Sequence, residues 1–346
     1  MTSSEPVHPA ATFVAGSAPE LLPFKAHPFI PAGLEWRRSG SLFCADLAIP
    51  PDLSANLHAV IPSFAMRCEG VWGWCALLEA QAGAKRAASS LRAVGEFPAH
   101  LAPQGTAGEA GITSAVDTFE IRDRFERVTL RLCVHAPDLE SLHVPWVASA
   151  ACLESRVLQA AFPASAGGRR ELQVPAKSQM QTPEIGKRIC SPTSVAMLAE
   201  YYGGTADPSD IAACAYCAAE DLYGVWPWNI YAAARRGVLG FLACFDAWES
   251  AARLLDRGIP LVASIRYAKG ELGGAALERE SVKPLGHLVV LRGYDGDRVL
   301  VNDPAAASRE EVPRAYKLNE FLHVWLTRSA LAYVLLPPPG SALHSG

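Results

Sequence analysis

The sequence predicts two domains of different class, an all-β sandwich of the jelly-roll kind followed by an α+β domain. The length of 346 residues exceeds that of one typical domain. Residues 127–135 alternate apolar and polar side chains as a half-buried strand does, whereas 190–203 place apolar side chains at helical spacing. We therefore expect the sandwich over 25–160, a linker over 161–172 and the α+β domain over 173–338.

Composition and charge limit the classes of function. Half of the residues are hydrophobic and 19% are charged, which excludes a largely disordered chain. The net charge of −4 gives no reason to expect a nucleic acid or an anionic membrane as partner. No apolar run reaches the roughly 18 residues of a membrane span, and the first twenty residues lack the features of a signal sequence. We expect a cytoplasmic protein without a membrane span.

The N-terminal region indicates short strands separated by loops. Residues 1–24 are small and Pro-containing, so we expect a mobile tail there and a second tail over 339–346. Nine cysteines are present without the regular spacing of a disulfide framework. In addition to 127–135, strands are expected over 41–49, 70–80, 116–121 and 143–149.

Four tryptophans of this region leave two alternatives open. Trp72 and Trp74 share one face if their segment is extended, and Trp36 and Trp146 accompany them in the pattern. Exposed aromatic rings would make the sandwich a module that binds a glycan or a protein. Buried rings would fill its core, and this alternative is favoured because a small sandwich needs large side chains inside.

The α+β region begins with a helix that carries a cysteine at its start. Pro192 suits the first helical turn, and Gly203 suits the C-terminal cap. Unpaired backbone N–H groups at a helix N-terminus favour a thiolate and lower the pKa of a cysteine there. Cys190 is therefore either a nucleophile or a small buried residue, and its partners decide between the two.

A predicted hairpin supplies these partners. Apolar runs at 288–291 and 299–301 flank the turn sequence Asp-Gly-Asp at 295–297. His287 begins the first strand and Asp303 follows the second, so the hairpin brings them together. A cysteine, a histidine base and an acid that orients the base form the arrangement used in nucleophilic catalysis.

The remaining elements follow from periodicity and from helix start and stop signals. Helices are expected from 207–211 onward and over 230–236, 247–257 and 318–326, and strands over 241–245, 259–267 and 330–336. Residues 269–284 form a Gly-rich excursion directly before His287. This segment is either a long loop that covers the cleft or a disordered insertion.

These motifs resemble the papain-like cysteine peptidases, in the branch of the double-glycine leader (bacteriocin-processing) peptidases, cysteine peptidase family thirty-nine. The resemblance narrows to bacterial members that share four motifs, which here are Ser178-Gln179-Met180, Cys190 to Val195, Gly286-His287-Leu288 and Val301 to Pro304. It extends over roughly residues 172–336 and implies a papain-like fold for the α+β domain.

The resemblance also implies a role for each motif. Cys190 would be the nucleophile and His287 the base, and Asp303 would orient the imidazole, with Asn302 as a weaker rival for that last role. Better-known relatives have Gly after the nucleophile, where this chain has Ser191.

The oxyanion hole is assigned from the same resemblance. The side-chain amide of Gln179 and the backbone N–H of Cys190 would donate to the oxyanion of the tetrahedral intermediate. The spacing from Gln179 to Cys190 is longer than in better-known relatives, which leaves Gln181 as a rival donor.

Two further features have alternative interpretations. Cys214 and Cys217 form a CxxC pattern, but they lie in an Ala-rich helical segment without a second ligand pair, so a structural role is favoured over zinc binding. Trp226 and Trp228 belong to an aromatic loop beside the expected cleft, where they would either line a substrate subsite or cap the core.

The sequence therefore predicts thiol-dependent hydrolysis of a peptide or amide bond through an acyl-enzyme thioester, with a peptide or protein as substrate and no metal or organic cofactor. One alternative resolves the same thioester with an amine or thiol, as an acyltransferase or transpeptidase does. Another is a catalytically silent binding protein that recognises its partner through the sandwich.

Overall fold

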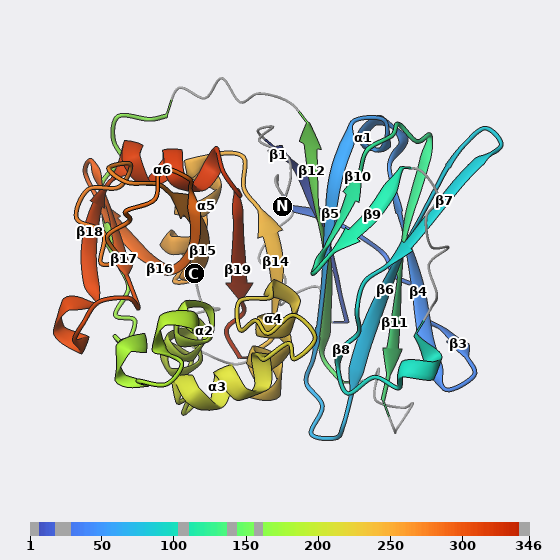
Figure 1. Ribbon diagram of the computed structural model, residues 1–346, viewed down its shortest axis with the longest axis horizontal. Coiled ribbons are helices and arrows are strands. Elements are labelled where there is room, and N and C mark those ends of the chain that lie inside the picture. The colour runs from blue at the N-terminus through green and yellow to red at the C-terminus, as the bar shows by residue number, and fades with distance from the viewer. Residues whose placement is uncertain (1–6, 18–28, 103–110, 137–143, 156–161, 339–346) are drawn as a thin grey trace.

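The computed structural model describes residues 7–17, 29–102, 111–136, 144–155 and 162–338. Strands β1 to β12 form two sheets in the N-terminal part, and strands β13 to β19 form a third sheet that packs with helices in the C-terminal part (Figure 1). The expected tail over 339–346 and the residues 1–6 and 18–24 of the other expected tail lie outside the described residues.

The first two sheets contain all strands up to residue 155. The first has the order β2 (Phe29–Pro31), β1 (Val7–Gly16), β12 (Trp146–Ser155), β5 (Leu57–Met66), β10 (Thr118–Ile121) and β9 (Ile112–Ala115). The second has the order β3 (Arg37–Ser39), β4 (Leu42–Ile49), β11 (Arg127–His135), β6 (Gly73–Ala82) and β7 (Lys85–Ser90), with β8 (Val94–Gly95) beside β6. A short helix, α1 (Pro51–Ser54), and a 3-10 turn, η2 (Ala99–Leu101), connect strands.

An aromatic cluster joins the two N-terminal sheets. Phe64 on β5 has its ring centroid 6.0 Å from that of Trp72 and 6.4 Å from that of Trp74. Trp36 and Trp146 pack edge to face at 5.4 Å, and both also contact Phe64. Trp72, Trp74 and Trp146 are buried, so these three rings fill the core, while Trp36 is partly exposed.

The two longest strands that the sequence did not predict, β1 and β5, belong to the first sheet. The expected tail over 1–24 is wrong for Val7–Gly16, which form β1 and pair with β12 and β2. Leu57–Met66 form β5, which was not expected at all. Strand β5 is buried along nearly its whole length, so it lacks the polar-apolar alternation by which a half-buried strand is recognised.

One disulfide bond crosses the second sheet. Cys44 on β4 and Cys133 on β11 face each other in register and are bonded. Cys75 on β6 opposes Cys133 from the other side and is a free, buried thiol. Spacing along the chain did not indicate this bond because its partners are 89 residues apart and are brought together only by strand pairing.

The C-terminal part combines one sheet with five α-helices in the described residues. The sheet has the order β14 (Gly240–Cys244), β19 (Leu331–Leu335), β15 (Leu261–Tyr267), β16 (Leu285–Asp295), β17 (Arg298–Asn302) and β18 (Pro313–Lys317), with β13 (Arg169–Glu171) beside β16. The helices are α2 (Cys190–Tyr201), α3 (Pro208–Ala215), α4 (Trp226–Arg235), α5 (Trp248–Asp256) and α6 (Leu318–Leu326). Three 3-10 turns are η4 (Gln179–Gln181), η5 (Gly186–Arg188) and η6 (Arg309–Glu311).

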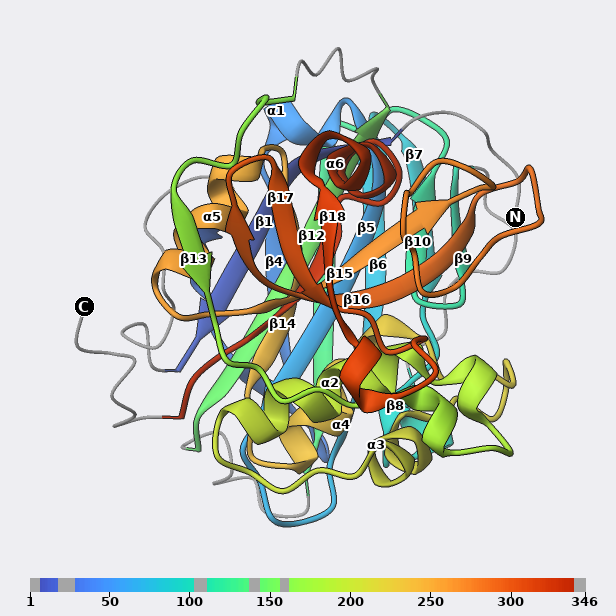
Figure 2. The same ribbon diagram turned by 90° about the vertical axis from the view of Figure 1, so that its left-hand side faces the viewer.

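Helices α2, α3 and α4 gather at one end of this part, while α6 lies at the other end (Figures 1 and 2). None of the helices in the described ranges is both long enough and apolar enough to cross a membrane. Helices α5 and α6 and strands β14, β15 and β19 agree with the sequence-based expectation to within two residues.

Two expected boundaries are corrected by the structure. Arg169–Glu171 lie in the expected linker over 161–172, yet they form β13 and pair with β16. Helix α4 begins at Trp226 and not after the aromatic loop, because Pro227 occupies the first helical turn, where its missing N–H has no consequence. The third sheet therefore starts before residue 173, and the aromatic segment is largely helical.

Side-chain hydroxyls of the first sheet cover the free edge of strand β14. The backbone N–H groups of Leu242 and Cys244 each donate to a hydroxyl, at 2.9 Å to Ser63 and at 2.9 Å to Thr12. Ser149 donates to the carbonyl of Leu242 at 2.8 Å. An edge strand normally leaves such groups unpaired, so the first sheet completes the hydrogen bonding of the third.

Candidate active site

Cys190 is the first residue of helix α2, at the end of the molecule where α2, α3 and α4 meet (Figure 1). The turn η5 leads into the helix, and the buried side chain of Ile189 anchors this entry. The next residue, Ser191, is fully buried, and its hydroxyl lies 2.8 Å from the Tyr333 hydroxyl on β19. The Ser191 side chain thus has a polar partner in its buried position.

The predicted hairpin brings His287 and Asp303 together. Strands β16 and β17 pair in antiparallel fashion, with Val290 opposite Asn302, so Asp303 follows β17 close to the beginning of β16. The imidazole Nε2 of His287 lies 2.8 Å from Asp303 Oδ1. Both side chains are almost completely buried. Because Nε2 faces the carboxylate, Nδ1 is the imidazole nitrogen left to interact with Cys190.

The carboxylate of Asp303 is held by three donors. Besides His287, the backbone N–H of Ala305 donates to Oδ1 at 2.9 Å, and the Tyr316 hydroxyl donates to Oδ2 at 2.6 Å. Burial alone raises the pKa of a carboxyl, but the charge of His287 and these hydrogen bonds outweigh it and lower the Asp303 pKa to about 2. Asp303 is therefore ionised over the whole physiological pH range.

The thiol of Cys190 and the imidazole of His287 shift each other in opposite directions. Burial opposes the thiolate, but the hydrogen bond and the charge of His287, with the backbone of Leu288, lower the pKa of Cys190 below its ordinary value. Burial also opposes the imidazolium, but Asp303 and Cys190 raise the pKa of His287 above its ordinary value. The arrangement favours a thiolate and imidazolium pair.

Tyr316 is a residue of this site that the sequence did not indicate. Its hydroxyl donates to the distal oxygen of Asp303 and reaches it from β18. No local pattern marks such a residue because the contact depends on how β17 pairs with β18. Tyr333, the partner of Ser191, comes from β19 and was missed for the same reason.

Removing the Tyr316 hydroxyl tests its role. We expect Tyr316→Phe to lower the free energy of unfolding by about 2 kcal/mol, because a hydrogen bond to a buried charged group contributes roughly 1.5–3 kcal/mol. Urea unfolding of both proteins at pH 7 measures this. Tyr294→Phe, which removes a hydroxyl that donates to the carboxylate of the exposed Asp256 at 2.6 Å, is the control. An unchanged midpoint for Tyr316→Phe would contradict the assignment.

The structure separates Asp303 from its rival Asn302. The side-chain amide of Asn302 donates to the backbone carbonyls of Val174 at 3.0 Å and Pro175 at 3.4 Å. It therefore ties the segment before η4 to β17, while Asp303 contacts the imidazole.

Gln179 and Gln181 lie in very different surroundings. Gln179 is buried, and its backbone N–H donates to the carbonyl of Pro304 at 2.8 Å, next to Asp303. Its side-chain oxygen has no hydrogen-bond partner among the described residues. Gln181 is exposed. The hydrogen bond to Pro304 links the Gln179 turn to the Asp303 loop, which favours Gln179 as the oxyanion donor, an assignment that stays a prediction.

Trp226 and Trp228 lie where the first two sheets meet helix α4. The backbone N–H of Trp226 donates to the Asp117 carboxylate at 3.0 Å. Trp228 packs edge to face on Tyr231 at 5.9 Å and lines a small pocket together with Trp74. Both rings are half-buried, and their role in a substrate subsite stays a prediction.

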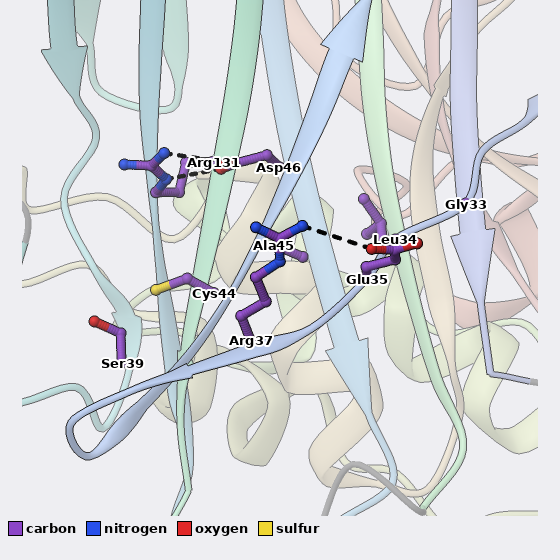
Figure 3. Close-up of a pocket in the computed structure, with 9 residues that line it drawn as sticks. All are labelled: Gly33, Leu34, Glu35, Arg37, Ser39, Cys44, Ala45, Asp46 and Arg131. Atoms are coloured by element: carbon purple, nitrogen blue, oxygen red, sulfur yellow. Dashed lines mark hydrogen bonds and ion pairs between the residues drawn. The ribbon is translucent and has the colours of Figure 1, made fainter.

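A larger pocket of about 560 Å³ lies on the second sheet (Figure 3). Its charged groups satisfy one another. Arg131 donates to both oxygens of Asp46, at 2.7 and 3.1 Å, and Arg37 lies 3.6 Å from Glu35. A glycan or protein ligand of the N-terminal part stays a prediction. In the CxxC pattern, Cys214 and Cys217 are free thiols, and within the described residues no group of His, Cys, Asp or Glu is arranged to hold a metal ion.

Comparison with known proteins gives two matches. Residues 171–333 match the model of the Peptidase_C39 like family. A crystal structure of a candidate C39-like peptidase from Bacillus anthracis is similar over 48% of this chain and 96% of its own, with 22% sequence identity and a TM-score of 0.38. No curated protein matches the sequence.

Proposed function

Residues 171–333 form a C39-like cysteine peptidase domain, and from this premise we propose that the protein hydrolyses peptide or amide bonds through Cys190, His287 and Asp303. The contact between His287 and Asp303, combined with the lowered pKa of Cys190, carries the proposal. We also propose that the domain has a papain-like fold over 173–338, and that the two N-terminal sheets form a sandwich module.

The proposed reaction uses a thiolate that exists before substrate binds. The Cys190 sulfur attacks the carbonyl carbon of the substrate and forms a tetrahedral oxyanion. His287, as imidazolium, donates its proton to the leaving nitrogen, the carbon–nitrogen bond breaks, and a thioester remains on Cys190. His287 then takes a proton from water, whose oxygen attacks the thioester and releases the carboxylic acid and the thiolate.

The oxyanion is stabilised by donors that are in place before the reaction. We assign this role to the backbone N–H of Cys190, which is one of the free donors at the N-terminus of α2, and to the side-chain amide of Gln179. The buried setting of Gln179 supports the assignment, because a fixed donor in a site of low dielectric interacts strongly with a developing charge.

Site-resolved alkylation tests the activated thiol without a known substrate. We expect iodoacetamide to label Cys190 faster than the other free cysteines, at a pH well below the ordinary thiol pKa of about 8.5. His287→Ala should move this labelling to higher pH. Mass spectrometry of tryptic peptides across pH 4–9 provides the measurement. Labelling of Cys190 that is no faster than that of Cys68 or Cys214, both half-buried free thiols, would contradict the proposal.

A peptide-library digest distinguishes hydrolysis from acyl transfer. The digest is run in a buffer without hydroxylamine, to which peptide amines are added. Under these conditions a hydrolase releases a free acid, whereas a transferase yields amide-linked adducts with the added amines. Release of the free acid as the dominant product is the expected result.

A further inference from the structure

The segment before the catalytic histidine places an arginine beside the site. Arg279 belongs to the Gly-rich excursion over 269–284, and its Nη2 donates to the carbonyl of Gly286 at 2.9 Å. Gly286 immediately precedes His287 in β16. The excursion is held in place by hydrogen bonds that include Lys269 N–H to the Ser281 carbonyl, at 3.0 Å. Arg279 therefore has a defined position.

An aromatic ring connects this arginine to the imidazole. The guanidinium of Arg279 lies 5.0 Å from the ring centroid of Tyr267. The Tyr267 ring lies 6.5 Å from the His287 ring, edge to face. Burial raises the Tyr267 pKa to about 12, with contributions from the charges of Asp303 and Cys190 that Arg279 opposes. The phenol is thus close to the arginine and to the catalytic groups alike.

Strand register adds an exposed apolar side chain to the same face. Ile265 pairs with His287 and Tyr267 pairs with Leu285, so these four side chains share one face of the sheet. Leu285 is 45% exposed. The rim beside the imidazole therefore combines a cation, an aromatic ring and an accessible apolar group.

The guanidinium lacks an acidic partner. In the described part of the chain, none of the ion pairs includes Arg279, although nearby Lys269 pairs with Glu280 at 3.1 Å. Its Nε–H is buried and has no hydrogen-bond partner among the described residues. A half-buried arginine without a carboxylate partner among the described residues is suited to binding the carboxylate of a ligand.

We propose that Arg279 and Leu285 form a specificity subsite that binds a carboxylate of the peptide substrate on the leaving-group side of the scissile bond. This inference rests on the proposed function, because the side is fixed by the role of His287 as proton donor to the leaving nitrogen. The residue attached to that nitrogen continues past the imidazole toward Tyr267, Arg279 and Leu285. The carboxylate belongs to an acidic side chain or to the C-terminus of a short substrate.

Paired peptides measure this preference by binding, independently of turnover. Fluorescein-labelled peptides carry two small residues at their centre. They are made in pairs that differ only by Glu or Gln at one of the three positions that follow these small residues. A second set has the charge before the small residues, and a third compares a free C-terminus with its amide. Fluorescence polarisation with the Cys190→Ala protein gives each affinity.

We expect the Glu or free-carboxylate member to bind about tenfold more tightly when its charge lies on the leaving-group side. Arg279→Gln, added to the same protein, should abolish this preference, while Arg279→Lys should keep part of it. Arg314→Gln is the matched control and should leave the preference unchanged. Arg314 likewise donates to a carbonyl of the excursion, at Gly274, and has a buried Nε without a partner among the described residues, but it lies on β18.

Three results would overturn the subsite. The first is equal affinity within every pair, which includes the case in which neither member binds. The second is a preference that survives in Arg279→Gln. The third is a preference confined to peptides with the charge before the small residues. Circular dichroism confirms that each variant is folded. Failure of the proposed function is detected in a different experiment, the alkylation of the wild-type protein, in which Cys190 would then be labelled no faster than the other free cysteines.

Discussion

Cys190→Ser is expected to lower the kcat/KM for peptide hydrolysis by about 10⁴-fold or more, because an alcohol in this position is not ionised by the neighbouring imidazole. The lowered pKa of Cys190 favours the thiolate, and serine has no equivalent state. Kinetics on a fluorogenic peptide selected from the library digest provide the measurement. The fold should be unaffected, since oxygen and sulfur differ little in size here.

The comparison variant for this experiment is Cys214→Ser. Cys214 is a half-buried free thiol in α3, and burial raises its pKa, so it has no activated state to lose. Its substitution should leave kcat/KM within about twofold of the wild type, because Cys214 is not part of the proposed triad. Substantial activity in Cys190→Ser would show that the hydrolysis has another nucleophile.

Asp303→Asn is expected to lower kcat by about 10³- to 10⁴-fold, as the loss of the orienting carboxylate does in a comparable triad. Asp303 raises the pKa of His287 and holds its Nε2 at 2.8 Å. With asparagine, His287 loses its proton at lower pH, so the alkaline limb of the pH–kcat profile moves to lower pH. The profile of the variant, measured from pH 4 to 10, checks this, and an unmoved alkaline limb would contradict it.

The same substitution changes how stability depends on pH. The Asp303 pKa is lower in the folded protein, so its contribution is present above the unfolded value of about 3.9 and is lost as pH falls through about 2. The His287 pKa is higher in the folded protein, so its contribution is complete below the unfolded value of about 6.5 and is lost as pH rises through the folded value. The stability difference between wild type and Asp303→Asn should therefore be largest between about pH 4 and 6.5. Urea unfolding across pH 3–10 measures it.

Local sequence patterns predicted the elements that carry the candidate catalytic groups. Helix α2 and the β16–β17 hairpin have clear periodicity and a clear turn, so Cys190, His287 and Asp303 could be placed at their ends. Strands β1 and β5 could not be found in this way. β5 is buried almost throughout, and it contains Pro62, a residue that is uncommon in the middle of a sheet.

Contacts between distant elements account for what the sequence did not show. Tyr316 binds Asp303 because β18 pairs with β17, and Arg279 reaches the rim because its loop returns to Gly286. The bond between Cys44 and Cys133 likewise depends on the pairing of β4 with β11. Each is a consequence of tertiary structure that no local pattern encodes.

The N-terminal sheets are expected to protect the peptidase domain from self-association through the hydroxyl groups of Thr12, Ser63 and Ser149. Without these hydroxyls, the N–H groups of Leu242 and Cys244 and the C=O group of Leu242 would lose their partners along a strand whose five residues are all buried in the intact protein. An apolar strand with an open edge is a template for pairing with another chain. Removal of the N-terminal sheets is therefore expected to expose this edge and to favour association of the remaining chain.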